Sequence, residues 1–95
     1  MATATAAVPT TSGSRYMQQL CKHWSHQFAV TFDAEQGRVA FPEATVIMTA
    51  GPEALAVVLD ADDPAVLEKM KGVVASHLDR FAFREAPLTF RWLTA

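Results

Sequence analysis

The residue types that carry chemistry are concentrated near the N-terminus, in residues 14–26. This stretch holds the single cysteine, two of the three histidines, the one tyrosine and one of the two tryptophans. Thiol, imidazole and phenol groups serve as nucleophiles, general bases and metal ligands in proteins. Any chemistry that the chain performs is therefore expected close to this stretch.

Cys21, His23 and His26 have the types of metal ligands, but a helix would hold them apart. At 100° per residue, Cys21 and His23 lie about 160° apart around the axis and cannot converge on one ion. His23 and His26 are three residues apart and can share an ion only if a further ligand is supplied. The pattern therefore favours a solvated histidine pair, and we expect no metal and no cofactor.

A nucleophilic Cys21 would need a base within hydrogen-bond reach and a lowered pKa. The neighbouring histidines lie on the wrong side of the helix, so a small buried thiol packed on a sheet is favoured. The sequence has no Gly-rich phosphate loop, no Ser–His–Asp arrangement and no carboxylate pair placed for acid–base work. We expect that the isolated chain is not an enzyme.

The same stretch has the periodicity of an amphipathic helix, predicted over residues 14–26. Its apolar residues fall within an arc about a third of the circle wide, which is the width of a core-facing stripe. They are Tyr16, Met17, Leu20 and Trp24, with Cys21 at the edge. His23 and His26 lie on a separate flank. Ser12 or Ser14 is expected to cap the start of the helix.

A second helix is predicted from Pro64 to Phe81, after the strong start signal Asp62-Asp63-Pro64. Its core stripe is Leu67, Met70, Val74, His77, Leu78 and Phe81. His77 is the one polar member, and a core histidine with internally satisfied nitrogens is favoured. The alternative is a proton-carrying or ligand-contacting histidine at the floor of a pocket.

Short segments of alternating or β-branched residues predict the strands. They are residues 3–8, 28–32, 38–41, 44–49, 55–59 and 88–93, with a turn at residues 33–37. The order β-α-β-β-β-β-α-β predicts one α+β domain over residues 1–95. We expect a mostly antiparallel sheet with a four-strand meander and two helices on one face.

Composition and charge exclude several classes of protein. The net charge of −2 gives no basic field for nucleic acid or anionic lipid. One cysteine cannot form an internal disulfide, the N-terminus lacks the charged and apolar regions of a signal peptide, and no apolar run reaches a membrane span. We expect a cytoplasmic protein with no nucleic-acid or membrane partner. Strands 3–8 and 88–93 can pair between subunits, but nothing in their sequence requires it.

Two blocks resemble a known family: residues 15–24 together with His26, and residues 77–85. Together they resemble the bacterial domain-of-unknown-function family 2218, and the resemblance covers nearly the whole chain. Members occur alone or fused to siderophore-interacting, FAD-binding reductase-like proteins. The resemblance therefore implies a link to iron or siderophore metabolism and a reductase-like partner, and it supplies no catalytic residues.

From these observations we expect a small accessory or binding domain. One alternative is direct binding of a ferric siderophore or haem by Tyr16, His23 and His26, because Tyr16 and His23 are spaced i, i+7. A second alternative is a structural interaction module without a ligand.

We hypothesise that the working surface lies where the ends of the two helices meet. It would consist of His23, His26, Asp79, Arg80 and Arg84. Arg80 and Arg84 are spaced i, i+4 and can jointly hold an acidic group. The alternative is that Asp79, Glu85 and the two arginines form solvated ion pairs, each worth about 0–1 kcal/mol.

Overall fold

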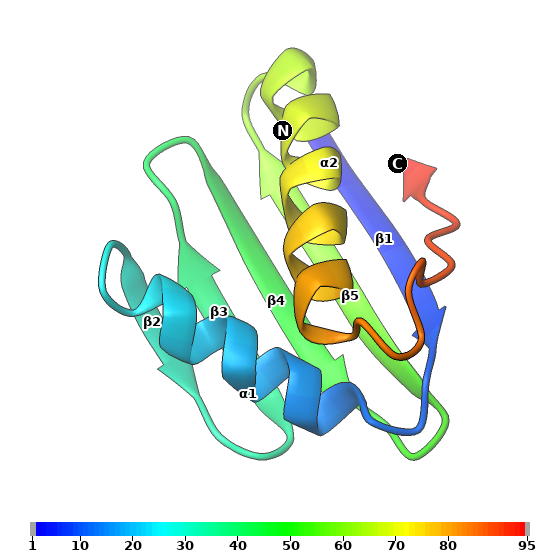
Figure 1. The fold of residues 1–95 in the computed structure, drawn as a ribbon. Coiled ribbons are helices and arrows are strands. Elements are labelled where there is room, and N and C mark those ends of the chain that lie inside the picture. Colours follow the sequence, from blue (N-terminus) through cyan, green and yellow to red (C-terminus); the bar gives the residue numbers. More distant parts are fainter. Residues whose placement is uncertain (1, 95) are drawn as a thin grey trace.

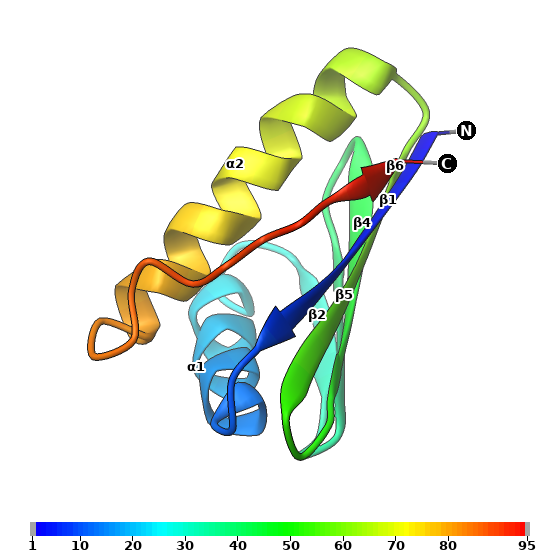
Figure 2. The same ribbon diagram turned by 90° about the vertical axis from the view of Figure 1, so that its right-hand side faces the viewer.

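One antiparallel sheet and two helices make up the fold in the computed structural model, which describes residues 2–94. The elements in chain order are β1 (Ala2–Pro9), α1 (Gly13–Trp24), β2 (Ala29–Phe32), β3 (Gln36–Ala40), β4 (Ala44–Ala50), β5 (Ala54–Ala61), α2 (Pro64–Phe81) and β6 (Leu93–Thr94). The strands lie in the order β2-β3-β4-β5-β1-β6. Both helices cover the same face of this sheet (Figures 1 and 2). The predicted α+β fold class, the meander and the one-sided helix layer are confirmed.

The N-terminal strand lies inside the sheet rather than at its edge. β1 pairs with β5 over its full length, from Ala2 opposite Ala61 to Pro9 opposite Ala54. On its other side β1 pairs with β6 only at Ala4 and Thr5. The two terminal segments therefore pair with each other in the sheet, through a very short ladder.

Successive side chains of a strand point to opposite faces of the sheet, so every second residue of each strand lies under the helices. The buried strand residues are Ala4, Ala6, Val8, Val39, Ala44, Val46, Met48, Leu55, Val57, Leu59 and Ala61. Both predicted helix stripes face them. α1 buries Tyr16, Met17, Leu20, Cys21 and Trp24, and α2 buries Leu67, Met70, Val74 and Leu78. His77 and Phe81 of the predicted stripe are only half-buried.

Close packing of α1 on β3 depends on a glycine. A Cβ atom at Gly37 would lie 2.7 Å from the Cys21 Sγ atom, which is closer than real contacts allow. Cys21 is fully buried at this point. The prediction of a small thiol packed against the sheet is confirmed. The predicted turn over residues 33–37 ends earlier, because β3 begins at Gln36.

The ends of α1 differ from the prediction. Ser12 precedes the helix without a side-chain capping bond, and the Ser14 hydroxyl donates to the Ala34 carbonyl instead. The expected serine cap is therefore wrong. α1 ends at Trp24, so His26 lies beyond it. α2 begins as predicted, since the Asp63 side chain accepts from the Ala65 N–H at 2.8 Å.

The strand predicted over residues 88–93 is wrong in its extent. Only Leu93 and Thr94 pair with β1. The Leu88 N–H donates to Asp79 Oδ1 at 2.8 Å, and the Leu88 side chain is buried. Because these contacts hold the segment against α2, its alternating residues run beside the helix layer before the chain reaches the sheet edge.

Candidate functional site

The C-terminal part of α2 lies over α1. In Figure 2, the distance between α2 and the sheet increases towards the C-terminal end of the helix at the lower left, and α1 lies between this end and the sheet. His23 and Trp24 of α1 meet His77 and Phe81 of α2 in ring contacts. The predicted meeting of the two polar helix ends is thus a crossing of the last turns of α2 over α1.

An imidazole–aromatic cluster occupies one half of this crossing. The His77 ring centroid lies 5.1 Å from that of Trp24 and 5.8 Å from that of His23. The His23 ring in turn lies 5.9 Å from that of Phe81. His77 Nδ1 lies 2.7 Å from the Val73 carbonyl oxygen, which only accepts, so Nδ1 donates its proton there. The expected internal partner of His77 is therefore present for one ring nitrogen.

A hydroxyl–carboxylate cluster occupies the other half. The Tyr16 hydroxyl donates to the Glu85 carboxylate. The hydroxyl of buried Thr10 donates to the same carboxylate, at 3.0 and 3.1 Å from its two oxygens. The pKa of Tyr16 is raised, first by this bond to Glu85 and then by burial. Sequence reasoning missed the cluster. A tyrosine on the core-facing side of a helix indicates that a partner for its hydroxyl is present, but the periodicity of the helix does not identify that partner.

Asp79 also has an internal role. Its carboxylate accepts the Leu88 N–H and ties the segment after α2 to the helix. With Glu85 bonded to Tyr16 and Thr10, neither acid belongs to a solvated cluster of ion pairs. That alternative is wrong for these two residues.

Two arginines from different elements line one small hollow. Arg15 of α1 and Arg84, which follows α2, line a cavity of about 60 Å³ together with Tyr16, Phe81 and Phe83. The Arg84 guanidinium carbon lies 5.8 Å from the centroid of the Phe83 ring. Among residues 2–94, no carboxylate forms an ion pair with Arg15 or Arg84.

The sequence predicted a different arginine pair, Arg80 with Arg84. α2 ends at Phe81, so helical i, i+4 spacing does not extend to Arg84. Arg80 is exposed and is not part of the hollow's lining, whereas Arg15 takes its place. Arg15 was missed because the pairing depends on where α2 crosses α1.

Charge is unevenly distributed despite the net value of −2. The exposed bases on α1 and at the end of α2 are Arg15, Lys22, Arg80 and Arg84, with His23 and His26 beside them. The two acids of this region, Asp79 and Glu85, accept internal hydrogen bonds. The helix crossing is therefore a basic surface that the overall composition hides.

Other predicted combinations are not brought together. His26 is exposed beyond α1 and makes no ring contact within residues 2–94, whereas His23 contacts His77. The Tyr16 hydroxyl is bonded to Glu85, and the Phe81 ring contacts that of His23. In the described part of the chain, no three His, Cys, Asp or Glu side chains form a group that could hold a metal ion.

Cys21 has the properties of an unreactive thiol. It is fully buried, and burial raises its pKa to about 11. A nucleophilic cysteine requires the opposite shift.

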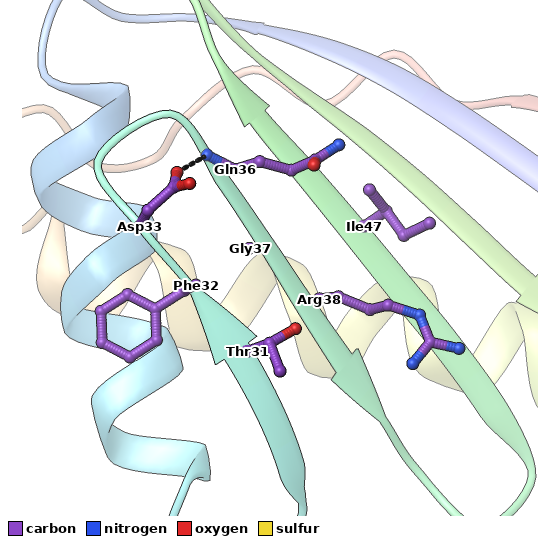
Figure 3. A pocket seen from close by; sticks show the side chains of 7 residues that line it. All are labelled: Thr31, Phe32, Asp33, Gln36, Gly37, Arg38 and Ile47. Carbon is purple, nitrogen blue, oxygen red and sulfur yellow. Dashed lines mark hydrogen bonds between the residues drawn. The ribbon is translucent and has the colours of Figure 1, made fainter.

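The helix-free face of the sheet has a shallow hollow of its own, of about 300 Å³. Figure 3 shows its lining residues: Thr31, Phe32, Asp33, Gln36, Gly37, Arg38 and Ile47. Asp33 accepts from the backbone N–H groups of Glu35 and Gln36, which lower its pKa. Arg38 is then the one remaining charge in the lining, so this hollow has fewer converging polar groups than the helix crossing.

No helix among residues 2–94 is long and apolar enough to span a membrane.

Comparison with known proteins places the chain among uncharacterised bacterial proteins. The family model described as "Uncharacterized protein conserved in bacteria (DUF2218)" matches residues 5–93. The structure is similar to the NMR structure of PA4090 from Pseudomonas aeruginosa, with a TM-score of 0.83 and 35% sequence identity. The match covers 98% of this chain and 96% of that chain. No curated protein matches the chain.

Proposed function

The chain belongs to the bacterial family DUF2218, and we propose that it is a non-catalytic docking domain that binds an acidic segment of a partner protein at the hollow between Arg15 and Arg84. The observation that carries the proposal is the pair itself. Two arginines from separate elements line one hollow, and no internal carboxylate pairs with either of them in the described part of the chain.

The chemistry of the hollow suits a carboxylate. Guanidinium groups present several N–H donors in a plane that matches a carboxylate, and such charge-assisted bonds are about twice as strong as neutral ones. Phe81 and Phe83 provide apolar walls that limit hydration of the bound group. The hollow has a volume of about 60 Å³, which is about the volume that two water molecules occupy in liquid water. It therefore admits one acidic side-chain head, and the rest of the partner would lie across the basic surface outside.

A siderophore-interacting, FAD-binding reductase-like protein is the partner class that we propose, and bacterial iron metabolism the setting. Support comes from the family resemblance, because members occur fused to such proteins. A domain that functions both alone and in fusion needs a surface for that partner. The helix crossing offers exposed arginines for this role. The cytoplasm is the proposed location, because a single cysteine cannot form an internal disulfide and this favours a reducing compartment.

The docking role requires no reaction on this chain. A buried thiol with a raised pKa does not act as a nucleophile at neutral pH. Direct binding of a ferric siderophore or haem by Tyr16, His23 and His26 has weaker support. The Tyr16 hydroxyl is already bonded to Glu85, and His26 lies beyond the crossing.

Calorimetric titration of the chain into a purified siderophore-interacting, FAD-binding protein from a bacterium that encodes both tests the proposal. The parent should bind, and added salt should weaken the complex because exposed charges are screened. Arg15→Ala and Arg84→Ala should each weaken binding by about 30-fold, and the double variant by roughly 1,000-fold, since each truncation of a charged interface pair costs about 2 kcal/mol or more. Arg38→Ala removes the same charge from the opposite face and should change nothing. A parent that does not bind, or a double variant that binds as tightly as the parent, would refute the docking role.

A further inference from the structure

The rings of His23 and His77 lie close to the separation of two ligands on one metal ion. With metal–nitrogen bonds of about 2.0–2.1 Å, two bound imidazole centroids lie roughly 4.5 Å apart at a nitrogen–metal–nitrogen angle of 90° and roughly 5.2 Å apart at the tetrahedral angle. The observed separation is 5.8 Å, with the ring planes tilted by 42°. This is wider than the tetrahedral value, and a small rotation of the exposed His23 side chain would close the difference. The two histidines come from different helices, so the spacing is fixed by helix packing rather than by one flexible loop.

The hydrogen bond of His77 selects the tautomer that a metal requires. Nδ1 donates to the Val73 carbonyl oxygen at 2.7 Å, which leaves Nε2 of the neutral ring with a free lone pair. Metal-binding histidines in proteins almost always donate their other ring N–H to a carbonyl or carboxylate in this way. The Trp24 ring, 5.1 Å away, restricts the imidazole further.

The pair is also accessible. His23 is exposed and His77 is half-buried, so an ion can reach the site from solvent without opening the core. Beyond the two histidines, the described residues add no third His, Cys, Asp or Glu ligand. Water or a ligand from outside the chain would complete the coordination shell.

We propose that His23 and His77 form a two-histidine binding site for a borderline divalent metal ion, Cu²⁺ or Zn²⁺, with its remaining positions open to exogenous ligands. Imidazole suits these ions, and the general affinity order places Cu²⁺ above Zn²⁺. Hard ions such as Mg²⁺ prefer oxygen ligands and are excluded by the ligand type. The site does not depend on the docking function, because Arg15 and Arg84 supply none of its ligands.

Titration of the chain with CuCl₂ and ZnCl₂, followed by calorimetry and by NMR of the imidazole nitrogens, tests the site. One ion of each metal should bind per chain, Cu²⁺ more tightly, and the ring nitrogens of both His23 and His77 should shift on adding diamagnetic Zn²⁺. His23→Gln and His77→Gln should each weaken binding by about tenfold or more, since even outer-shell partners of metal ligands are worth about 10–100-fold. Glutamine keeps much of the side-chain volume at position 77, and an unchanged NMR spectrum outside the site establishes that each variant folds.

His26→Gln is the matched control, because it removes an exposed imidazole three residues from His23. This variant should bind both metals as the parent does. Retained affinity in His77→Gln with loss in His26→Gln would assign the ion to His23 and His26 and overturn the proposal. Absence of stoichiometric binding by the parent would overturn it as well. Arg15→Ala with Arg84→Ala should leave metal binding intact, so failure of the docking role and failure of the metal site are separate outcomes.

Discussion

The hydroxyl of Tyr16, near the start of α1, donates a hydrogen bond to the carboxylate of Glu85, which follows α2. This bond connects the beginning of one helix to the chain beyond the other, and Tyr16 also lines the hollow with Arg15 and Arg84. The hydrogen bond fixes the position of Glu85, which is next to Arg84 in the chain.

Tyr16→Phe should lower the free energy of unfolding by about 1–2 kcal/mol, the range for a bond to a charged group that stays partly solvated. The ring keeps its place in the core, so only the hydroxyl is lost. Urea unfolding at neutral pH measures the change. Thr31→Val removes an exposed hydroxyl from β2 and should have little effect. A Tyr16→Phe variant as stable as the parent would show that the bond contributes nothing.

Stability should fall at alkaline pH because of Cys21. Its pKa is raised from 9.0 to about 11 in the folded chain, so the folded state keeps a proton that the unfolded state releases. This contribution is fully present below pH 9 and is lost as the pH rises through about 11. Tyr16, whose pKa is raised above 10.0, adds a second loss at higher pH.

Urea midpoints measured across this pH window, for the parent and for Cys21→Ala, test the assignment. The variant should show a smaller decline between pH 9 and 11, whatever its stability at neutral pH, and should retain the part of the decline that is due to Tyr16. An equal decline in both proteins would contradict a buried thiol as the cause.

Asp79→Ala should release the segment after α2. The buried Leu88 N–H loses its acceptor, which costs about 1–3 kcal/mol for an unsatisfied buried group. Hydrogen exchange of the Leu88 amide should become much faster. Glu43→Ala, in the turn between β3 and β4, removes an exposed acid as a control. Unchanged protection of Leu88 in Asp79→Ala would refute the role of the carboxylate.

Two glycine-to-alanine changes should have opposite signs. Gly37→Ala places a Cβ atom 2.7 Å from Cys21 Sγ and should destabilise by about 1–3 kcal/mol, as overpacking does. Gly72→Ala meets no atom within 4 Å in an exposed part of α2 and should stabilise by up to about 1 kcal/mol. Adding Cys21→Ala should relieve much of the cost at Gly37. Strictly additive effects of Gly37→Ala and Cys21→Ala would exclude a direct contact.

The local features of the fold were predictable from sequence, and the long-range ones were not. α2 follows the prediction from Pro64 to Phe81 because its cap, its proline and its apolar period all lie within the segment. The strand predicted over residues 88–93 failed because Asp79 competes for the Leu88 N–H. No pattern within the segment itself reveals that competition.

The candidate site divides in the same way. His23 and Arg84 were identified as ionisable residues near helix ends, and both lie at the crossing. Their partners, His77 and Arg15, depend on the point at which α2 crosses α1. That point is set by the packing of both helices on the sheet and is not encoded in the period of either helix. Glu85 was likewise assigned to solvent because its partners, Tyr16 and Thr10, are far away in sequence.

The most direct test of the central claim is NMR mapping of the surface that the reductase-like protein contacts. Amide and side-chain signals of the isotope-labelled chain would be followed while the unlabelled partner is added. The docking proposal predicts that the largest changes fall on Arg15, Phe81, Phe83 and Arg84, and that they disappear in the variant with both arginines replaced. Changes centred on Arg38 and Ile47 of the helix-free face would contradict it.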